Sequence, residues 1–596
     1  IWSNGSTIPF VTERSTHEDT GRLHGAARHS RSHRSPRRRH HRCARPAHAV
    51  REGCVALQAR RSEHRRAGTG GRDAARPAPL GRTGRPRRRL RRDAVLGPDR
   101  VVHRAANAVL AASAGARMNA GLPLLHDTFA RGARRAADTG TPTLASVSVP
   151  LRPLDFFDLI AAWDDGATPW FFHEAGDASV TLFGWDGALE LTATGDTRFA
   201  QIDARWHTLV RDAVMAGPQP PRLVGGFRFD SHGPRSTHWA PFPDASMTVA
   251  KLLVVREGDA HWAVCQHVVA AHDDPAALAH ACLARIESLG TLAAAHDDDA
   301  PHLLHTQALQ ASEWQHEVRR AVDAIRGGRF GKVVLARDVL DQYARPVAVA
   351  PLLRRLRKRD AHAHLFAVRR EGACFVGATP ERLARVAAGD VRTHALAGTI
   401  RRGATPDDDR ALGAALMDSA KERLEHALVV DAIRAALAPL SRILDVPGQP
   451  SLHRLPRLQH LSTPIRATLK ADATLLQVVA ALHPTPAVAG HPRAEALDHI
   501  RAHEGFDRGW YAAPVGWIDA HGNGDFIVAL RSALVEGGAC RLFAGCGIVA
   551  DSEPVNEYQE TELKLSGMQA AIRVRDAAAE ANASGAAKVS TSSTVE

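Results

Sequence analysis

Apolar and polar positions alternate along much of the chain after residue 142, and this alternation predicts β-strands. Runs such as TLASVSVPL (143–151) and MTVAKLLVV (247–255) read as strands with one buried face. Other segments have a helical period, among them DPAALAHACLARIESL (274–289). The mixture continues to about residue 575. It predicts an α/β protein of the α+β type, with a largely antiparallel sheet and added helices.

The first 117 residues follow neither pattern. They hold 27 Arg, no Lys and 8 Asp or Glu, a net charge of +19. Because the whole chain carries +13, residues 118–596 carry −6. A segment so rich in charge, with no sustained apolar face, cannot offset the entropy lost on ordering. We therefore predict that residues 1–117 are disordered.

This Arg-rich segment has two interpretations. Arg clusters neutralise phosphates, which favours a nucleic-acid-binding tail. The same composition arises when GC-rich DNA upstream of a start codon is translated, and the first methionine is Met118. We favour the second interpretation and expect no nucleic-acid binding by the folded body. We expect an N-terminal part of the fold over 118–309, a catalytic region over 310–575 and a disordered tail over 576–596.

The remaining composition excludes several classes of protein. No run of eighteen apolar residues occurs, so no transmembrane helix is expected, and no segment resembles a signal peptide. The 7 cysteines are scattered and form no CxxC pair, which argues against a disulfide framework or a zinc site. A reducing, cytoplasmic location is the natural expectation.

Carboxylates recur at helical spacing in two segments, SAKERLEHALVVDAIRAAL (419–437) and DSEPVNEYQETELKLSGM (551–568). Each set shares one helix face: Asp418, Glu422 and Glu425 in the first, and Glu553, Glu557, Glu560 and Lys564 in the second. Alone, each stripe is more often a solvated surface. If the two stripes faced each other, they would repel unless a cation lay between them. Oxygen ligands without His or Cys favour Mg²⁺.

An acid and a base can also be proposed. Lys332 begins the predicted strand GKVVLARDV (331–339), where a lysine is usually solvated. Glu381 follows Pro380 in FVGATPERL (375–383), which reads as a strand, a tight turn and a helix start, so a capping role is also possible. The functional interpretation makes Lys332 a general base and Glu381 a general acid. Spacing alone does not show that the two side chains meet.

Two glycine-bearing segments and one arginine could bind anions. HALAGTIRRG (394–403) and RLFAGCGIV (541–549) read as turns next to strands, which can aim backbone N–H groups at an anion, although a bulge is the simpler interpretation. Arg531 lies in FIVALRSALV (526–535), which we predict to be an apolar strand. A buried guanidinium needs an anionic partner, and a ligand carboxylate is one candidate.

Taken in order, these motifs resemble a known family. Residues from about 310 to 575 resemble the chorismate-utilising enzymes, which include anthranilate, aminodeoxychorismate, salicylate and isochorismate synthases. The resemblance rests on KVVLAR, GATPERL, ALAGT, SAKERLEH, LQHLSTP, LHPTPAVAG, DRGWYAAPVGW, VALRSA, RLFAGCGIV and NEYQETELK. It implies a single large fold with two mostly antiparallel sheets flanked by helices and an active site between them. Residues 142–300 would form the N-terminal half of the same fold.

The resemblance also implies roles for particular residues. Glu425 and Glu560 would bind Mg²⁺, assisted by Glu422 and Glu557, and the substrate would be chorismate. Lys332 would be the catalytic base and Glu381 the catalytic acid. The substrate would contact seven further residues: Gly398, His460, Tyr511, Arg531, Gly545, Gly547 and Lys564.

Three features point to one branch of this family. Lys332 stands where the ammonia-using anthranilate enzymes typically have glutamine, and Ala397 stands where aminodeoxychorismate enzymes often have lysine. LHPTPAVAG (482–490) and PVGWIDAHGNGDF (514–526) are most similar to isochorismate synthases. The implied activity is Mg²⁺-dependent conversion of chorismate to isochorismate, for siderophore, salicylate or menaquinone biosynthesis, by a monomer. The alternative is a salicylate synthase, which also eliminates pyruvate.

Two departures from the family pattern are visible. Glu422 stands where many relatives have Asp, which keeps the charge, and Ala512-Ala513 replaces a Gly-containing pair after Tyr511. Neither departure removes a catalytic group.

Overall fold

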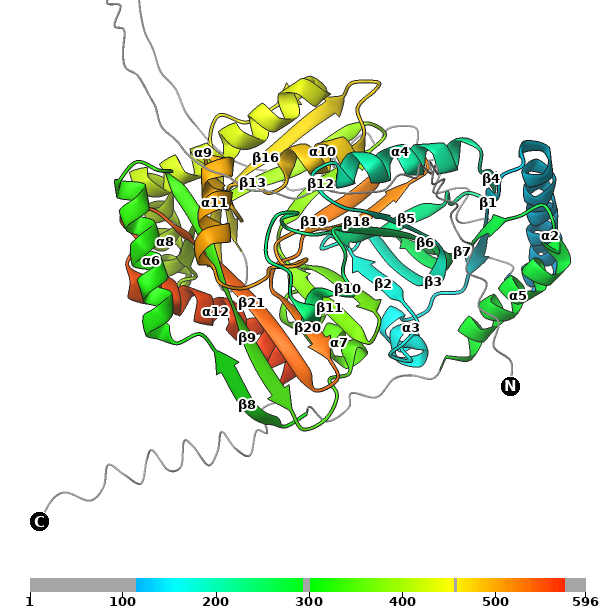
Figure 1. Cartoon of the computed structure of the whole chain (residues 1–596), viewed down its shortest axis with the longest axis horizontal. Coiled ribbons are helices and arrows are strands. Elements are labelled where there is room, and N and C mark those ends of the chain that lie inside the picture. The colour runs from blue at the N-terminus through cyan, green and yellow to red at the C-terminus, as the bar shows by residue number, and fades with distance from the viewer. Residues whose placement is uncertain (1–113, 293–300, 455–457, 574–596) are drawn as a thin grey trace, which may run out of the picture. The chain divides into compact units, whose positions relative to one another are not determined.

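A computed structural model of the chain describes residues 114–292, 301–454 and 458–573. The predictions of disorder for 1–117 and 576–596 fall almost entirely outside these ranges. The helices are α2 (Ala114–Thr139), α3 (Phe156–Trp163), α4 (Arg198–Arg211), α5 (Pro275–Ser288), α6 (Ala311–Arg326), α7 (Val349–Arg359), α8 (Pro406–Asp418), α9 (Ala420–Leu437), α10 (Leu475–Leu482), α11 (Arg493–His503) and α12 (Pro554–Ile572) (Figure 1).

The strands alternate with these helices along the whole described chain. They are β1 (Thr143–Leu151), β2 (Trp170–Glu174), β3 (Val180–Ala193), β4 (Val214–Ala216), β5 (Arg222–Phe227), β6 (Ala245–Glu257), β7 (Ala260–Val269), β8 (Leu303–Ala308), β9 (Lys332–Tyr343), β10 (His364–Arg370), β11 (Ala373–Thr379), β12 (Arg382–Ala387), β13 (Asp390–Arg401), β14 (Ser441–Asp445), β15 (Ser451–Arg454), β16 (Leu458–Leu469), β17 (Gly490–His491), β18 (Pro514–Asp519), β19 (Gly524–Val528), β20 (Ser532–Glu536) and β21 (Ala539–Ile548).

All of these strands belong to one hydrogen-bonded network. Among the described strands, β1 and β4 run parallel and the other pairs are antiparallel. This confirms the predicted α/β class and the largely antiparallel sheet. Strands from before and after residue 309 join in one network, because β2 pairs with β10 and β5 pairs with β18.

The network divides at β6 into two long arms and a short branch through β7, β1 and β4, so the expectation of two separate sheets needs correction. β6 pairs with β3 along its whole length, whereas residues 245–249 also pair with β5 and residues 252–257 with β7. One arm continues from β3 through β2, β10, β11, β20 and β21 to β9. The other runs from β5 through β18, β19, β12 and β13 to β16. A register shift in β3 between Gly187 and Leu189 accompanies the divergence.

Hydrophobic side chains from both arms meet in one buried cluster. Phe366, Phe375 and Phe543 come from the first arm, and Val515 and Phe526 from the second. A second cluster lies where α3, α7 and α12 cover the first arm and where α2, with α5 beside it, covers β1 and β7 (Figure 1). Burial of this apolar surface, at about 25 cal/mol per Å², fixes where the ends of β9, β21 and α12 lie. The candidate site is built at those ends.

Both helices predicted to carry carboxylates are confirmed. Ser419 caps α9, because its Oγ accepts a hydrogen bond from the Glu422 backbone N–H at 3.3 Å. Glu553 precedes Pro554 at the start of α12. Asp418 is the last residue of α8, so its assignment to the same stripe as Glu422 was wrong. In the described part of the chain, no helix is both long and apolar enough to cross a membrane.

Candidate active site

Lys332 lies at the start of β9 and is buried, not solvated. Its side chain reaches α9, where Nζ lies 2.5 Å from Oε1 of Glu425. Only 4% of Lys332 is exposed. Room for the side chain comes from the neighbouring strand, since a Cβ atom at Gly547 of β21 would lie 2.8 Å from Cε of Lys332. The prediction of β9 was correct, and a buried lysine there needs the Glu425 carboxylate as its partner.

The second set of carboxylates approaches β21 from α12. Glu557, Glu560 and Lys564 share one face of this helix, as the spacing predicted. Lys564 Nζ lies 2.6 Å from Glu560 Oε1 and donates a hydrogen bond to the Gly545 carbonyl at 2.8 Å. This face therefore points at the glycine segment of β21. We expected a turn around Gly545, but the residue lies inside a continuous strand.

The glutamates on each helix repel one another. Burial and the charge of Glu425 raise the pKa of Glu422. Burial and the charge of Glu560 likewise raise the pKa of Glu557. Burial alone would raise the pKa of Glu560 too, but the charge and hydrogen bond of Lys564, with the charges of Arg531 and His460, together outweigh burial and lower the pKa. Crowded carboxylates of this kind are stabilised by added positive charge.

Glu381 lies in the turn between β11 and β12. The prediction that a helix begins here was wrong, because residue 382 starts a strand. The interpretation of Glu381 as a helix cap was therefore wrong too. Burial raises the pKa of Glu381 to about 7, although the charges of Lys332 and Lys564 oppose this rise. A carboxyl group with this pKa can carry and release a proton near neutral pH.

The backbone of Glu381 is held from two sides, and sequence reasoning missed the residue responsible. The Glu381 N–H donates to Thr379 Oγ1 at 3.2 Å, and the Thr379 hydroxyl donates to the Val528 carbonyl at 2.7 Å. Val528 N–H donates in turn to the Glu381 carbonyl at 3.0 Å. Thr379 is fully buried. In the sequence, only the position of Thr379 next to Pro380 and Glu381 indicated that it could support the acid.

Gly398 lies at a bulge where β13 pairs with β16, next to Thr399, the cross-strand partner of His460. Gly398 has a φ of +77° at a bulge, and a Cβ atom there would lie 3.1 Å from Glu422 Oε2. The next residue, Thr399, donates its N–H to Glu422 at 3.3 Å, and its hydroxyl lies 2.9 Å from His460 Nδ1. Burial lowers the pKa of His460 to about 4, and the charges of Arg531 and Lys564 add to this effect. His460 is therefore a neutral imidazole at neutral pH. The turn predicted around Gly398 is a strand bulge instead.

Arg531 occupies a break between β19 and β20, with a φ of +50°, so the prediction of a continuous strand was wrong. Burial lowers its pKa, while Tyr511 and Glu560 oppose that shift. Among the described residues, no hydrogen bond or ion pair satisfies its guanidinium. Tyr511 is 4% exposed, and a Cβ atom at Gly545 would lie 3.3 Å from its hydroxyl oxygen. A half-buried, unpaired guanidinium is suited to bind the carboxylate of a ligand.

The structure thus gathers residues from five separate parts of the chain. The charges of Lys332 and Lys564 shift the pKa of Glu381, and the charge of Arg531 shifts the pKa values of His460 and Glu560. Residues 131–573 match the family described as chorismate binding enzyme. The chain belongs to the chorismate-binding enzymes.

Comparison with individual proteins agrees with this membership. The chain is 49% identical over 463 residues to the salicylate biosynthesis isochorismate synthase of Pseudomonas aeruginosa, covering 76% of this chain and 94% of the relative. It is 33% identical to an isochorismate synthase of Bacillus subtilis, covering 71% and 91%. The fold resembles the menaquinone-specific isochorismate synthase of Escherichia coli, with a TM-score of 0.62, 27% identity, and 75% and 100% coverage.

The family resemblance implies a cation, and the glutamates fit one. All four donors (Glu422, Glu425, Glu557 and Glu560) are carboxylates, and two of them have pKa values raised in part by a neighbouring carboxylate. In the structure a lysine contacts one carboxylate on each helix, at 2.5 and 2.6 Å. A hard divalent cation prefers this set of oxygen ligands to nitrogen or sulfur.

Another cluster of possible ligands lies outside this site. Within the described ranges, His173, His364 and Asp525 are the only three such side chains with donor atoms all within 4.8 Å of one another. Asp525, however, accepts a hydrogen bond from Arg382 at 3.0 Å, and Nδ1 of His364 accepts one from Gly176 at 3.2 Å. The only carboxylate of the cluster is therefore already neutralised, so we do not interpret it as a metal site.

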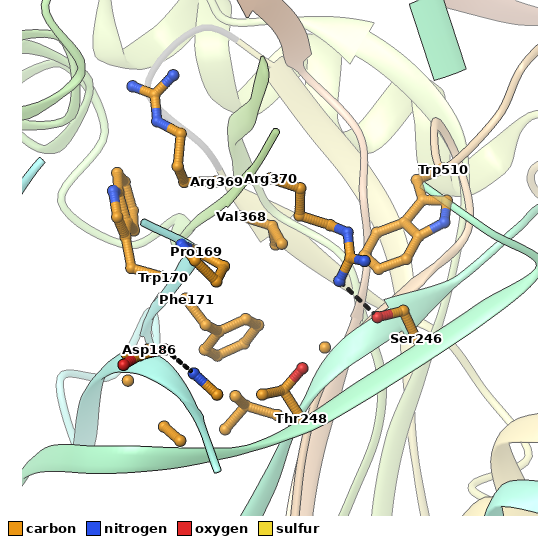
Figure 2. A pocket seen from close by; sticks show the side chains of 15 residues that line it. Pro169, Trp170, Phe171, Asp186, Ser246, Thr248, Val368, Arg369, Arg370 and Trp510 are labelled. Atoms are coloured by element: carbon orange, nitrogen blue, oxygen red, sulfur yellow. Dashed lines mark hydrogen bonds between the residues drawn. The ribbon is translucent and has the colours of Figure 1, made fainter. Parts of the chain in front are cut away.

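A separate pocket of the chorismate-binding enzyme lies beside the divergence of the two arms (Figure 2). Trp170, Phe171 and Trp510 line it, and none of the proposed catalytic residues does. Its polar groups are already paired, because Arg370 donates to Ser246 Oγ at 2.7 Å and Trp510 donates to the Pro243 carbonyl at 2.8 Å. This pocket offers no reactive group to a substrate.

Proposed function

We propose that this chorismate-binding enzyme is an isochorismate synthase, which moves the ring hydroxyl of chorismate from C4 to C2. The observation that carries the proposal is a buried amine, Lys332, whose charge acts on a carboxyl group, Glu381, with a pKa raised to about 7. Water addition at one carbon and hydroxyl loss at another require one proton acceptor and one proton donor. The two isochorismate synthases at 49% and 33% identity support the same activity.

Substrate binding is assigned to Arg531, Tyr511 and Lys564. Chorismate carries two carboxylates, and we propose that Arg531 and Tyr511 bind one of them. Lys564 lies on the same side of the site, beside the Gly545 carbonyl, and adds positive charge. Gly398, Gly545 and Gly547 leave space that a side chain would fill, since a Cβ atom at each would lie within 3.4 Å of a neighbouring atom. Neutral His460 completes the wall of the site.

Glu425 and Glu560 would hold Mg²⁺, with Glu422 and Glu557 assisting. When bound, Mg²⁺ would supply positive charge for the ring carboxylate of the substrate and would engage Glu425, the present partner of Lys332. The donor chemistry and the mutual repulsion of the glutamates support this assignment.

Two side chains of the protein, Lys332 and Glu381, carry out the proton transfers. Lys332, in its neutral form, accepts a proton from the water molecule that attacks C2. The ring double bonds shift, and Glu381 donates its proton to the C4 hydroxyl, which leaves as water. Glu381 is suited to this step because it is still protonated near neutral pH. Thr379 positions the carboxyl group through its backbone contact.

Product analysis tests the activity. Purified enzyme with chorismate and Mg²⁺ should form isochorismate in a reversible equilibrium, with little pyruvate. Stoichiometric pyruvate and salicylate would identify a salicylate synthase instead. An ammonia-dependent product would contradict the role of Lys332 as a water activator. Because the Pseudomonas aeruginosa relative is named for salicylate biosynthesis, we propose that the product of this enzyme enters the same kind of pathway.

A further inference from the structure

The described part of the chain contains five free and buried thiols: Cys265, Cys282, Cys374, Cys540 and Cys546. Two of them differ from the rest because they are hydrogen-bonded to each other: Cys265 on β7 and Cys282 on α5. Helix α5 lies beside α2, which packs against β1 and β7 (Figure 1). None of the proposed active-site residues lies on these elements.

An imidazole completes this group. His267, two residues after Cys265 on β7, places its Nε2 atom 3.3 Å from the sulfur of Cys282. The Phe129 ring from α2 contacts the imidazole edge-on, with 5.4 Å between ring centroids. His267 is half-buried, whereas Cys282 is 5% exposed. A thiol, an imidazole and a second thiol therefore lie together, held by three elements.

These contacts make the two thiols chemically unequal. The hydrogen bond from Cys265 lowers the pKa of Cys282, and the hydrogen bond and charge of His267 add to this effect against the opposing effect of burial. The hydrogen bond to Cys282, together with burial, raises the pKa of Cys265. By contrast, burial raises the pKa of Cys374 and of Cys540 to about 12. The thiolate is the reactive form of cysteine, and the imidazole of His267 lies 3.3 Å from Cys282, where it can take the thiol proton, so we assign Cys282 as the nucleophile of this group.

We propose that Cys282 and Cys265 form a redox-active thiol pair that reduces a small hydroperoxide, with His267 as the proton partner of Cys282. The Cys282 thiolate attacks one peroxide oxygen, so that an S–O bond forms and the O–O bond breaks. The alkoxide or hydroxide that leaves takes the proton held by His267. The Cys265 thiol then attacks the sulfenic acid; an S–S bond forms, the S–O bond breaks, and water leaves with the thiol proton.

The atoms and electrons of these steps balance. Two thiols are oxidised to one disulfide. An organic hydroperoxide is reduced to an alcohol and one water, and hydrogen peroxide is reduced to two waters. An external dithiol returns the pair to its reduced form by exchange. The disulfide would join α5 to β7 without touching Lys332 or Glu381, so oxidation should leave kcat unchanged.

Peptide mapping of the full chain provides the test. The reduced enzyme is treated with hydrogen peroxide near neutral pH, digested without reductant and analysed by mass spectrometry. We expect a disulfide between the peptides of Cys265 and Cys282 that dithiothreitol reverses. In Cys265→Ser, a reagent specific for sulfenic acids should label Cys282. In His267→Gln, Cys282 should react about tenfold more slowly, because the thiolate fraction falls.

Cys374→Ser is the matched control, since it removes a buried thiol that has no thiol partner among the described residues, and it should oxidise like the native enzyme. Mapping also separates Cys43 and Cys54, which lie outside the described ranges. The proposal fails if the native enzyme forms no 265–282 disulfide, or if Cys374 is oxidised as fast as Cys282. The first of these results needs no variant, so it does not depend on how a substitution folds.

Discussion

Replacing Glu381 with glutamine tests the buried acid most directly, because the structure predicts opposite effects on stability and on catalysis. The pKa of Glu381 rises from 4.5 to about 7 in the folded enzyme. At 1.36 kcal/mol for each pKa unit, this shift corresponds to about 3 kcal/mol of unfolding free energy. The glutamine side chain has nearly the same shape as a protonated glutamic acid but never carries the charge.

The sign follows from proton binding. Between about pH 4.5 and about pH 7 the folded enzyme holds a proton on Glu381 that the unfolded chain has lost, so stability falls as the pH rises through this window. Below it, both states are protonated and the substitution changes little. Above it, the native enzyme bears the full cost of a buried charge. Glu381→Gln should therefore be more stable than the native enzyme at about pH 8, by up to about 3 kcal/mol, and nearly equal at about pH 5.

Urea unfolding at both pH values measures this difference. The same substitution should impair catalysis, with kcat falling by about 10²-fold or more. The decline of native kcat above about pH 7, where the acid loses its proton, should also disappear in the variant. Glu495→Gln, on the exposed side of α11, is the control and should change stability equally at both pH values. An equal stability difference for Glu381→Gln at both pH values would refute the buried-acid assignment.

Three further predictions concern the base, the metal and the N-terminal segment. Lys332→Gln should lower kcat by about 10²-fold or more with a smaller change in KM, measured as isochorismate formation; near-native turnover would contradict water activation by the amine. Glu425→Gln and Glu560→Gln should each raise the Mg²⁺ concentration needed for half-maximal rate, because each removes a charged ligand. EDTA should abolish native activity and added Mg²⁺ restore it, whereas full activity without metal would exclude the site. A chain beginning at Met118 should match the full chain in kcat and KM, since the core residues described on α2, Leu125 and Phe129, lie beyond Met118; loss of activity on this truncation would contradict the prediction.

Sequence and structure contributed differently to the site. Periodicity alone predicted α9, α12 and β9, because a one-sided apolar pattern fixes both the element and the face that is buried. The same reasoning misjudged short segments. The turn at Glu381 was assigned a helix, and the glycines of β13 and β21 were assigned turns. In these segments, long-range strand pairing overrides local preference.

Arg337 illustrates a signal that could have been used. It lies in the apolar segment KVVLAR, as Arg531 lies in FIVALR, so the argument for a buried guanidinium applied to both. In the structure Arg337 is 2% exposed, donates to Thr561 at 2.8 Å and pairs with Glu562, which attaches α12 to β9. Arg531 has no such partner among the described residues. Sequence could place both arginines in apolar segments, but could not show which of them was left for a ligand.

The sequence by itself determined the α/β class, the family, and the residue types that carry the chemistry, because these depend on local pattern and on the order of motifs. Only the tertiary structure decided which residues meet. Lys332 and Glu425 are 93 positions apart, and their contact depends on how β9, β21 and α9 pack. The raised pKa of Glu381 likewise comes from burial by distant segments. Burial and electrostatics act through space, so the spacing of residues along the chain cannot specify them.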